Sequence, residues 1–268
     1  MPLFQEILKN NKNSFFLIAG PCVVESYDNV SQIAETLKEL CSKMNIPFIF
    51  KASYRKANRS KSSSFTGLGD DIALKILDDI KGNFDLPICT DFHSAQEAEM
   101  AAQVADIIQV PAFLCRQTDI LHAAGETKKI VNIKKGQFLS PESMGFATEK
   151  LAETGNKKIM LTERGTSFGY TDLIVDFRGI PSMKSFGYPV VLDVTHSLQQ
   201  PNQTTGVSGG RPEMIATIAK AGIAAGVNGI FLETHPKPSK ALSDGANMLQ
   251  LDKVEKLLVD LLRIYHAV

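Results

Sequence analysis

The chain, 268 residues long, lacks several features that mark whole classes of proteins. It has no tryptophan and 5 tyrosines, a composition that weakly disfavours an adhesive protein-recognition surface. Its 4 cysteines, at positions 22, 41, 89 and 115, form no CxxC pair. Secreted disulfide scaffolds are shorter and denser in cysteine, so we expect a reducing, cytoplasmic environment.

Neither charge nor hydrophobicity is concentrated in one part of the chain. Lys plus Arg and Asp plus Glu number 29 each, which leaves no positive excess to attract nucleic acid or an anionic membrane surface. No apolar run approaches the ~20 residues of a membrane span, and the first residues lack the pattern of a signal peptide. We therefore expect neither nucleic acid nor a membrane as a partner.

What the sequence does contain is a regular alternation of two patterns. Apolar runs rich in β-branched residues occur at 15–20, 47–52, 86–92, 106–112, 129–135, 158–165, 188–196 and 228–236. Segments of helical periodicity lie between them, for example at 30–44, 70–80, 94–105, 143–155 and 211–226. Near-continuous hydrophobicity is typical of parallel strands covered on both faces, and eight strand–helix pairs predict a (β/α)8 TIM barrel. A doubly wound sheet is the alternative, but no GxGxxG follows the first run.

The chain shows no internal boundary, because no linker rich in Pro, Gly or Ser interrupts the alternation. We expect one catalytic domain, the barrel over residues 14–268, preceded by an N-terminal extension over residues 1–13. Leu3, Phe4, Ile7 and Leu8 would let this extension form a short amphipathic cap on the barrel floor.

Reactive side chains follow every one of the apolar runs. Active sites of (β/α)8 barrels lie at the carboxyl ends of the strands. The side chains at these ends are Cys22, Lys51, Asp91, Gln109, Lys134 with Lys135, Glu163 with Arg164, Asp193 with His196, and Glu233 with His235. Charges also mark where any buried strand emerges, but that explanation accounts poorly for a reactive residue at all eight ends.

Two chemical subsets stand out among these residues. The first is cationic: Lys51, Lys56, Arg59, Lys134 and Arg164, with Arg116 and Arg211 in nearby loops. Such a set indicates an anionic substrate that carries phosphate or carboxylate groups. The second comprises Cys22, His196, Glu233 and Asp244, whose side chains can bind a divalent transition metal. On spacing alone, Cys22 as a small buried apolar residue and His196 as a hydrogen-bonding residue remain open alternatives.

The sequence resembles the 3-deoxy-D-manno-octulosonate 8-phosphate synthases through most of its length. The blocks that carry the resemblance are AGPCVVES (19–26), FKASYRKANRS (50–60), TDFHS (90–94), IIQVPAFLCRQTD (107–119), VNIKKGQF (131–138), TERGTSFGY (162–170), VLDVTHSLQQP (191–201), SGGR (208–211), LETHPKP (232–238) and LSDGANML (242–249). The related 3-deoxy-D-arabino-heptulosonate 7-phosphate synthases carry a KPRTSP-like motif where this chain reads KANRS over residues 56–60.

The resemblance implies an enzyme, a C–C bond-forming transferase that condenses phosphoenolpyruvate with D-arabinose 5-phosphate for lipopolysaccharide synthesis. Phosphoenolpyruvate would be held by Lys51, Ser53, Lys56, Gln109, Ala112, Lys134 and Arg164. The pentose phosphate would be held by Asn58, Arg59 and Ser60, with Arg116 supplied by a neighbouring subunit of a homotetramer. Residues 199–208 would form a mobile loop over the substrates.

The resemblance also implies a metal-dependent enzyme. Members of the metal-independent class have Asn where this chain has Cys22, and tend to have Cys where it has Ser243. Cys22, His196, Glu233 and Asp244 would then bind Zn, Fe(II), Mn or Co, and Cys22, Lys134, His196 and Asp244 would be the catalytic residues.

Two other functions fit the sequence, and three further residues have expected roles. A heptulosonate synthase acting on erythrose 4-phosphate and a non-catalytic barrel that senses a sugar phosphate are the other functions considered. Asp91 would form an ion pair with Lys51 or Lys134, and His235 would support the site from behind Glu233. Cys41, on a helix face with Leu37 and Leu40, is expected in the core.

Overall fold

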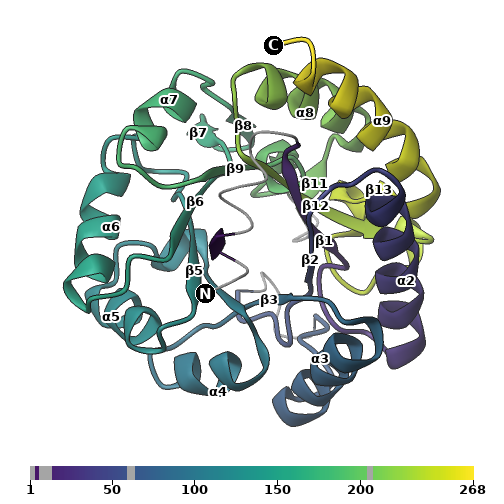
Figure 1. Cartoon of the computed structure of the whole chain (residues 1–268), viewed down its shortest axis with the longest axis horizontal. Helices are drawn as coiled ribbons and strands as arrows, with labels where there is room; N and C mark the ends of the chain where they lie inside the picture. Colours follow the sequence, from purple (N-terminus) through teal and green to yellow (C-terminus); the bar gives the residue numbers. More distant parts are fainter. Residues whose placement is uncertain (1–3, 6–13, 59–63, 204–207) are drawn as a thin grey trace.

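A closed barrel of eight parallel strands forms the centre of the molecule (Figure 1). The computed structural model describes residues 4–5, 14–58, 64–203 and 208–268. The barrel strands are β1 (Phe16–Gly20), β2 (Phe48–Lys51), β3 (Ile88–Asp91), β4 (Ile107–Val110), β5 (Ile130–Lys134), β6 (Ile159–Glu163), β9 (Val190–Asp193) and β12 (Gly229–His235). Strand β12 closes the barrel against β1, with Phe16 opposite Gly229 and Gly20 opposite Glu233. The predicted barrel is confirmed, and this closure rules out the doubly wound sheet.

Helices surround the barrel as an outer ring (Figure 1). They are α2 (Tyr27–Lys43), α3 (Asp70–Phe84), α4 (Glu97–Val104), α5 (Thr118–Glu126), α6 (Met144–Glu153), α7 (Gly179–Lys184), α8 (Ile215–Ala224) and α9 (Val254–Tyr265). The five helical segments given as examples from the sequence are confirmed as α2, α3, α4, α6 and α8. Helix α2 begins where the Ser26 hydroxyl accepts a hydrogen bond from the Asn29 amide, and it buries Cys41, as predicted.

Apolar side chains pack in two layers, one inside the barrel and one between the strands and helices. Along β1, Phe16 and Ile18 point into the barrel, whereas Leu17 and Ala19 pack toward the helices. This alternation follows from the two-residue period of a strand. Phe4, half-buried, packs against the inner layer, in keeping with the expected cap, while Leu3, Ile7 and Leu8 lie outside the described residues.

Short elements extend the barrel at its carboxyl end. They are the hairpin β7 (Thr166–Phe168) and β8 (Asp172–Ile174), the ribbon β10 (Gln199–Gln200) and β11 (Gly209–Gly210), strand β13 (Leu249–Gln250), and the 3-10 turns η1 (Ala112–Leu114), η2 (His196–Leu198), η3 (Pro212–Met214), η4 (Pro238–Lys240), η5 (Gly245–Asn247) and η6 (Leu251–Lys253). Within the expected loop over 199–208, Gln199 and Gln200 pair with β11. Residues 204–207 lie outside the described residues. Among the helices described, none is long and apolar enough to cross a membrane.

Candidate active site

A cavity of about 1810 Å³ lies at the carboxyl ends of the strands and extends beyond the barrel mouth toward α8 and α9. The cations at the barrel mouth that line it are Lys51, Lys56, Lys134 and Arg164. All four are at most 9% exposed, so their charges are largely removed from solvent. Buried cations need anionic partners, and among the described residues Lys51 pairs with Glu233 and Asp91, and Lys134 with Asp193.

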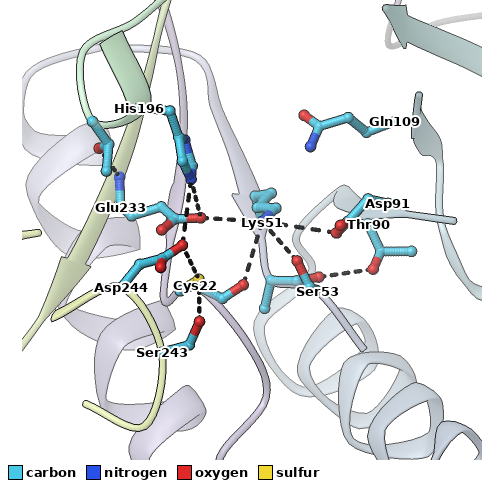
Figure 2. Close-up of polar contacts among 12 residues, drawn as sticks. Cys22, Lys51, Ser53, Thr90, Asp91, Gln109, His196, Glu233, Ser243 and Asp244 are labelled. Carbon is cyan, nitrogen blue, oxygen red and sulfur yellow. Dashed lines mark hydrogen bonds and ion pairs between the residues drawn. The ribbon is translucent and has the colours of Figure 1, made fainter. Parts of the chain in front are cut away.

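Lys51 lies at the centre of the polar network (Figure 2). Its Nζ donates to Ser53 Oγ at 3.0 Å and to Glu233 Oε1 at 3.3 Å, and lies 3.8 Å from Asp91 Oδ1. Of the two partners considered for Asp91, the structure therefore shows Lys51. Burial by itself would raise the pKa of Asp91, but the neighbouring Lys51 and Lys56 cations outweigh burial and lower it.

Lys134, the last residue of β5, has Asp193 as its anionic partner. Its Nζ donates to Asp193 Oδ2 and lies 3.7 Å from the centre of the Phe231 ring. Burial lowers the pKa of Lys134, although the Asp193 carboxylate partly opposes this shift. The sequence predicts Asp193 only as a strand-end residue and assigns it no role. Its position as the last residue of β9 is the feature that could have identified it.

Asp193 also fixes the imidazole of His196. Its Oδ2 lies 2.7 Å from His196 Nδ1, and its Oδ1 accepts the backbone amides of Thr195 and His196 at 3.0 and 2.8 Å. The other ring nitrogen, Nε2, lies 3.6 Å from Glu233 Oε1 and 3.9 Å from Asp244 Oδ2. The ring is therefore oriented with Nε2 toward two carboxylates.

The predicted metal ligands come together at one side of the cavity (Figure 2). Ligand atoms of Cys22, Glu233 and Asp244 all lie within 4.8 Å of one another, and His196 adjoins both carboxylates. Closure of β12 against β1 brings Cys22 and Glu233 together. Asp244 lies in a loop, where its backbone adopts the left-handed conformation with φ of 48°. Cys22 Sγ lies 3.0 Å from Ser243 Oγ and 3.5 Å from Asp244 Oδ2.

The donor set fits a divalent transition metal. Glu233 is fully buried, and its Oε2 has no hydrogen-bond partner among the described residues. A buried carboxylate oxygen without a donor points to a cation at this place. Burial, together with the Glu233 and Asp244 charges, raises the pKa of the Cys22 thiol well above its usual range. A metal ion is the kind of neighbour that stabilises the thiolate, and a thiolate, an imidazole and carboxylates suit borderline-soft cations.

Gln109 presents an amide to the cavity in a fixed orientation. Thr162 Oγ1 donates to Asn132 Oδ1 at 2.7 Å, and Asn132 Nδ2 donates to Gln109 Oε1 at 3.0 Å. Because the Gln109 oxygen is engaged inside the barrel, its NH2 group remains to donate toward the cavity, which suits an anionic ligand. Ala112 and Asn58 also line the cavity.

Other predicted residues lie in different positions. Ser53 is buried beneath Lys51, and Arg59 and Ser60 lie outside the described residues. Arg116 is exposed and is not among the described residues that line the cavity. Arg211 donates to Asp172 at 3.2 Å, at an exposed pair.

Lys135 and Glu163, both strand-end residues noted in the sequence, form a buried ion pair behind the cavity. Their charged atoms lie 3.5 Å apart, and Lys135 Nζ also donates to Gly165 O and Thr166 Oγ1. These two residues hold the loops that follow β5 and β6, whereas Lys134 and Arg164, one position away, face the cavity.

His235 connects two loops beside the metal ligands. Its Nε2 lies 2.7 Å from Asn29 Nδ2 and 3.6 Å from Glu25 Oε2, and Glu25 Oε1 accepts the Leu242 amide at 2.8 Å. The segment that leads to Asp244 is thus attached to the start of α2. These contacts are with Asn29 and Glu25, so the supporting role expected for His235 behind Glu233 stays a prediction.

A (β/α)8 barrel whose mouth gathers buried lysine and arginine beside a thiol, an imidazole and carboxylates defines an enzyme class that acts on anionic substrates. Residues 2–263 match the model of the DAHP synthetase I family, and the chain belongs to this family. Proteins named 2-dehydro-3-deoxyphosphooctonate aldolase are among its relatives. That of Desulfosudis oleivorans is 52% identical over 94% of this chain and 90% of its own length. Those of Koribacter versatilis and Desulfotalea psychrophila are 49% and 47% identical, over 94% and 100% of this chain and 92% and 95% of theirs.

Proposed function

We propose that this chain condenses phosphoenolpyruvate with D-arabinose 5-phosphate and water to give 3-deoxy-D-manno-octulosonate 8-phosphate and inorganic phosphate. The observation that carries the proposal is the convergence of Lys51, Lys56, Lys134 and Arg164 on one cavity. Both substrates are phosphorylated, and one also bears a carboxylate. The names of relatives that are 47–52% identical over nearly the whole chain support the same reaction.

Phosphoenolpyruvate is held by the cations at the strand ends. Arg164 offers a planar fork to phosphate or carboxylate oxygens, and its Nη1 has no hydrogen-bond partner among the described residues. Lys51 and Lys134 supply compact charges, and the Gln109 amide supplies a neutral donor. Ser53 orients Lys51, and Ala112 and Lys56 complete the wall. Asn58, with Arg59 and Ser60 that follow it in the sequence, receives the pentose phosphate.

The reaction then forms one C–C bond and replaces one C–O bond at C2 with another. The π electrons of phosphoenolpyruvate form a bond from its C3 to the aldehyde carbon of the pentose, whose oxygen takes up a proton. Lys134, which lines the cavity, would donate that proton, and burial, which lowers its pKa, eases the transfer. Water adds at C2 of the former phosphoenolpyruvate, and one of its protons replaces the one given to the aldehyde oxygen. The bond from C2 to the phosphate oxygen then breaks as the C2 hydroxyl becomes a carbonyl, and its proton leaves with the inorganic phosphate.

Cys22, His196, Glu233 and Asp244 would hold a divalent ion, namely Zn, Fe(II), Mn or Co. Such an ion supplies Lewis-acid polarisation of an oxygen atom when bound. The protein's contribution is geometric, because Asp193 orients His196 and the barrel closure places Cys22 beside Glu233. His196 and Asp244 line the cavity and so adjoin the pentose as well.

The active form is proposed to be a homotetramer in which each site receives Arg116 from a neighbour. Arg116 is exposed and does not line the part of its own barrel's cavity that the structure describes. Phe113, three residues before Arg116, and Phe138, which follows β5, are each 56% exposed. Exposed aromatic residues of this size favour burial against another subunit.

Release of phosphate from phosphoenolpyruvate tests the proposed reaction. The purified protein, supplied with divalent metal, is expected to release phosphate with arabinose 5-phosphate and far less with erythrose 4-phosphate. A preference for erythrose 4-phosphate would instead identify a heptulosonate synthase. Binding of sugar phosphates with no release from either aldehyde would identify a non-catalytic barrel. The intact cation set and the KANRS segment at 56–60 favour the first outcome.

A further inference from the structure

The carboxylate of Glu97, outside the cavity, accepts four hydrogen bonds. Glu97 is the first residue of α4. Its Oε2 accepts from Tyr54 Oη and from the His93 amide, the latter at 3.1 Å. Its Oε1 accepts from Ser94 Oγ at 2.8 Å and forms an ion pair with Arg55 Nη2 at 2.7 Å. Both oxygens are therefore fully used inside the protein.

Two of these donors belong to the segment that enters the cavity after β2. Tyr54 and Arg55 immediately precede Lys56 and Asn58, which line the cavity. Tyr54 is fully buried, so its hydroxyl has a fixed position. His93 Nε2 lies 2.9 Å from the Arg55 carbonyl oxygen, which attaches the same segment a second time.

The remaining cavity residues do not depend on Glu97 in this way. Lys51, Gln109 and Lys134 belong to barrel strands, and Arg164 directly follows one. Their positions are set by the ladders of the barrel. Beyond Lys51, Ser53 still pairs with Val23, and the Lys56 amide donates to Thr66 O at 2.7 Å. Between these two points the contacts with Glu97 hold the side chains of Tyr54 and Arg55.

Charge makes the contact specific to a carboxylate. Burial by itself would raise the pKa of Glu97, but hydrogen bonds from Tyr54, Ser94 and Arg55 outweigh burial and lower it. Glu97 is thus ionised at neutral pH and presents acceptors only. An amide in its place would direct its NH2 group at two of the four donors and lose those hydrogen bonds.

We propose that Glu97 is a positioning residue for the pentose phosphate: it holds residues 54–58 so that Asn58, which lines the cavity, meets the aldehyde substrate. The inference rests on the proposed function, since it assumes that this segment receives arabinose 5-phosphate. It assigns to α4, outside the cavity, a part in selecting and orienting the second substrate.

The test compares Glu97→Gln with Glu99→Gln. Glu99 lies two residues further along α4 and is exposed, so the two variants lose the same charge on the same helix. Glu97→Gln is expected to raise KM for arabinose 5-phosphate by about tenfold, while Kd for phosphoenolpyruvate, measured by calorimetry, changes by less than about twofold. Glu99→Gln is expected to match the wild type in both. Tyr54→Phe removes one donor alone, so a smaller rise in the same KM is expected.

Each outcome decides the inference. An unchanged KM for arabinose 5-phosphate in Glu97→Gln, or an equal loss of affinity for both substrates, overturns it, because a general structural role would affect both. If Glu97→Gln does not fold, the same two quantities are measured for Tyr54→Phe: an unchanged KM for arabinose 5-phosphate, or an equal loss of affinity for both substrates, overturns the inference. Absence of turnover of arabinose 5-phosphate by the wild type and Glu99→Gln would refute the proposed function instead, so the two failures are distinguishable.

Discussion

His196 Nδ1 lies 2.7 Å from Asp193 Oδ2, and the same carboxylate oxygen accepts a hydrogen bond from Lys134. One buried carboxylate therefore contacts both a proposed metal ligand and a proposed substrate-binding lysine. Because Asp193 accepts from Nδ1, the neutral ring carries its proton there, and Nε2 is left as a lone-pair donor facing Glu233 and Asp244.

Asp193→Asn is expected to weaken metal binding by about 10–100-fold. The amide NH2 of Asn donates to Nδ1, which moves the ring proton to Nε2 and removes the ligand lone pair. Competition with a chromophoric chelator measures the affinity. Asp172→Asn, at a partly exposed pair with Arg211, is the control and is expected to bind metal like the wild type. Wild-type affinity in Asp193→Asn would contradict the assignment of His196.

Removal of metal is expected to abolish phosphate release. The protein is dialysed against a strong chelator, and Zn, Mn, Fe(II) or Co is then added back; Ca²⁺ serves as the control, because it prefers oxygen ligands over thiolate. Full activity in chelator would contradict a metal role for Cys22. The Cys22→Asn variant refines the result, since activity of that variant in chelator would limit the metal to orienting the pentose.

Arg116→Ala is expected to lose activity, and mixing it with inactive Lys134→Ala is expected to restore part of that activity. In mixed oligomers, an Arg116→Ala barrel keeps its own Lys134 and can receive Arg116 from a Lys134→Ala neighbour. Turnover of the mixture is compared with the sum of the separate variants. Arg178→Ala, at a highly exposed arginine, is the control for loss of a surface charge. A mixture no more active than that sum would contradict a shared site.

The Glu97 contacts are expected to stabilise the protein at neutral pH and to weaken in acid. The folded-state pKa of Glu97 is lowered, so its contribution is complete above the unfolded value of about 4.3 and is lost as pH falls toward the folded value. Urea unfolding at several pH values measures this. The stability difference between wild type and Glu97→Gln should shrink below about pH 4.3. A difference that grows in acid would show the opposite sign and contradict the lowered pKa.

Two glycine substitutions are expected to act in opposite directions. A Cβ at Gly20 would lie 2.1 Å from the Lys51 carbonyl oxygen, which is backbone and cannot move aside, so Gly20→Ala should destabilise the barrel by about 3 kcal/mol or more. Gly82, in α3, has no heavy atom within 4 Å of such a Cβ. Gly82→Ala should stabilise by up to about 1 kcal/mol. Thermal unfolding compares the two, and equal stability would contradict the close approach of β1 and β2.

The strands and their reactive ends were predictable from the sequence, because a buried parallel strand is a local pattern. The run at 129–135 predicts a strand wherever its partners lie, and Lys134 follows as a strand end. Cys22 and Glu233 meet because a closed barrel places its last strand beside its first, and β12 pairs with β1. The short ribbons β7–β8 and β10–β11 were not predicted, since two or three polar residues carry no period that identifies a strand.

Sequence patterns could not decide which of two similar side chains forms a given contact. Neighbours Lys134 and Lys135 are chemically alike, yet one faces the cavity and pairs with Asp193, while the other pairs with Glu163 behind it. Glu97 shows no motif that would distinguish it from Glu99.

The sequence by itself determined the periodic order of strands and helices, and hence the barrel and the residues at its mouth, because burial imposes those periods along the chain. Only the tertiary structure decided which of these residues meet. Strand register, barrel closure and the paths of the loops set distances between groups far apart in the chain, and hydrogen bonds and ion pairs depend on those distances within tenths of an ångström.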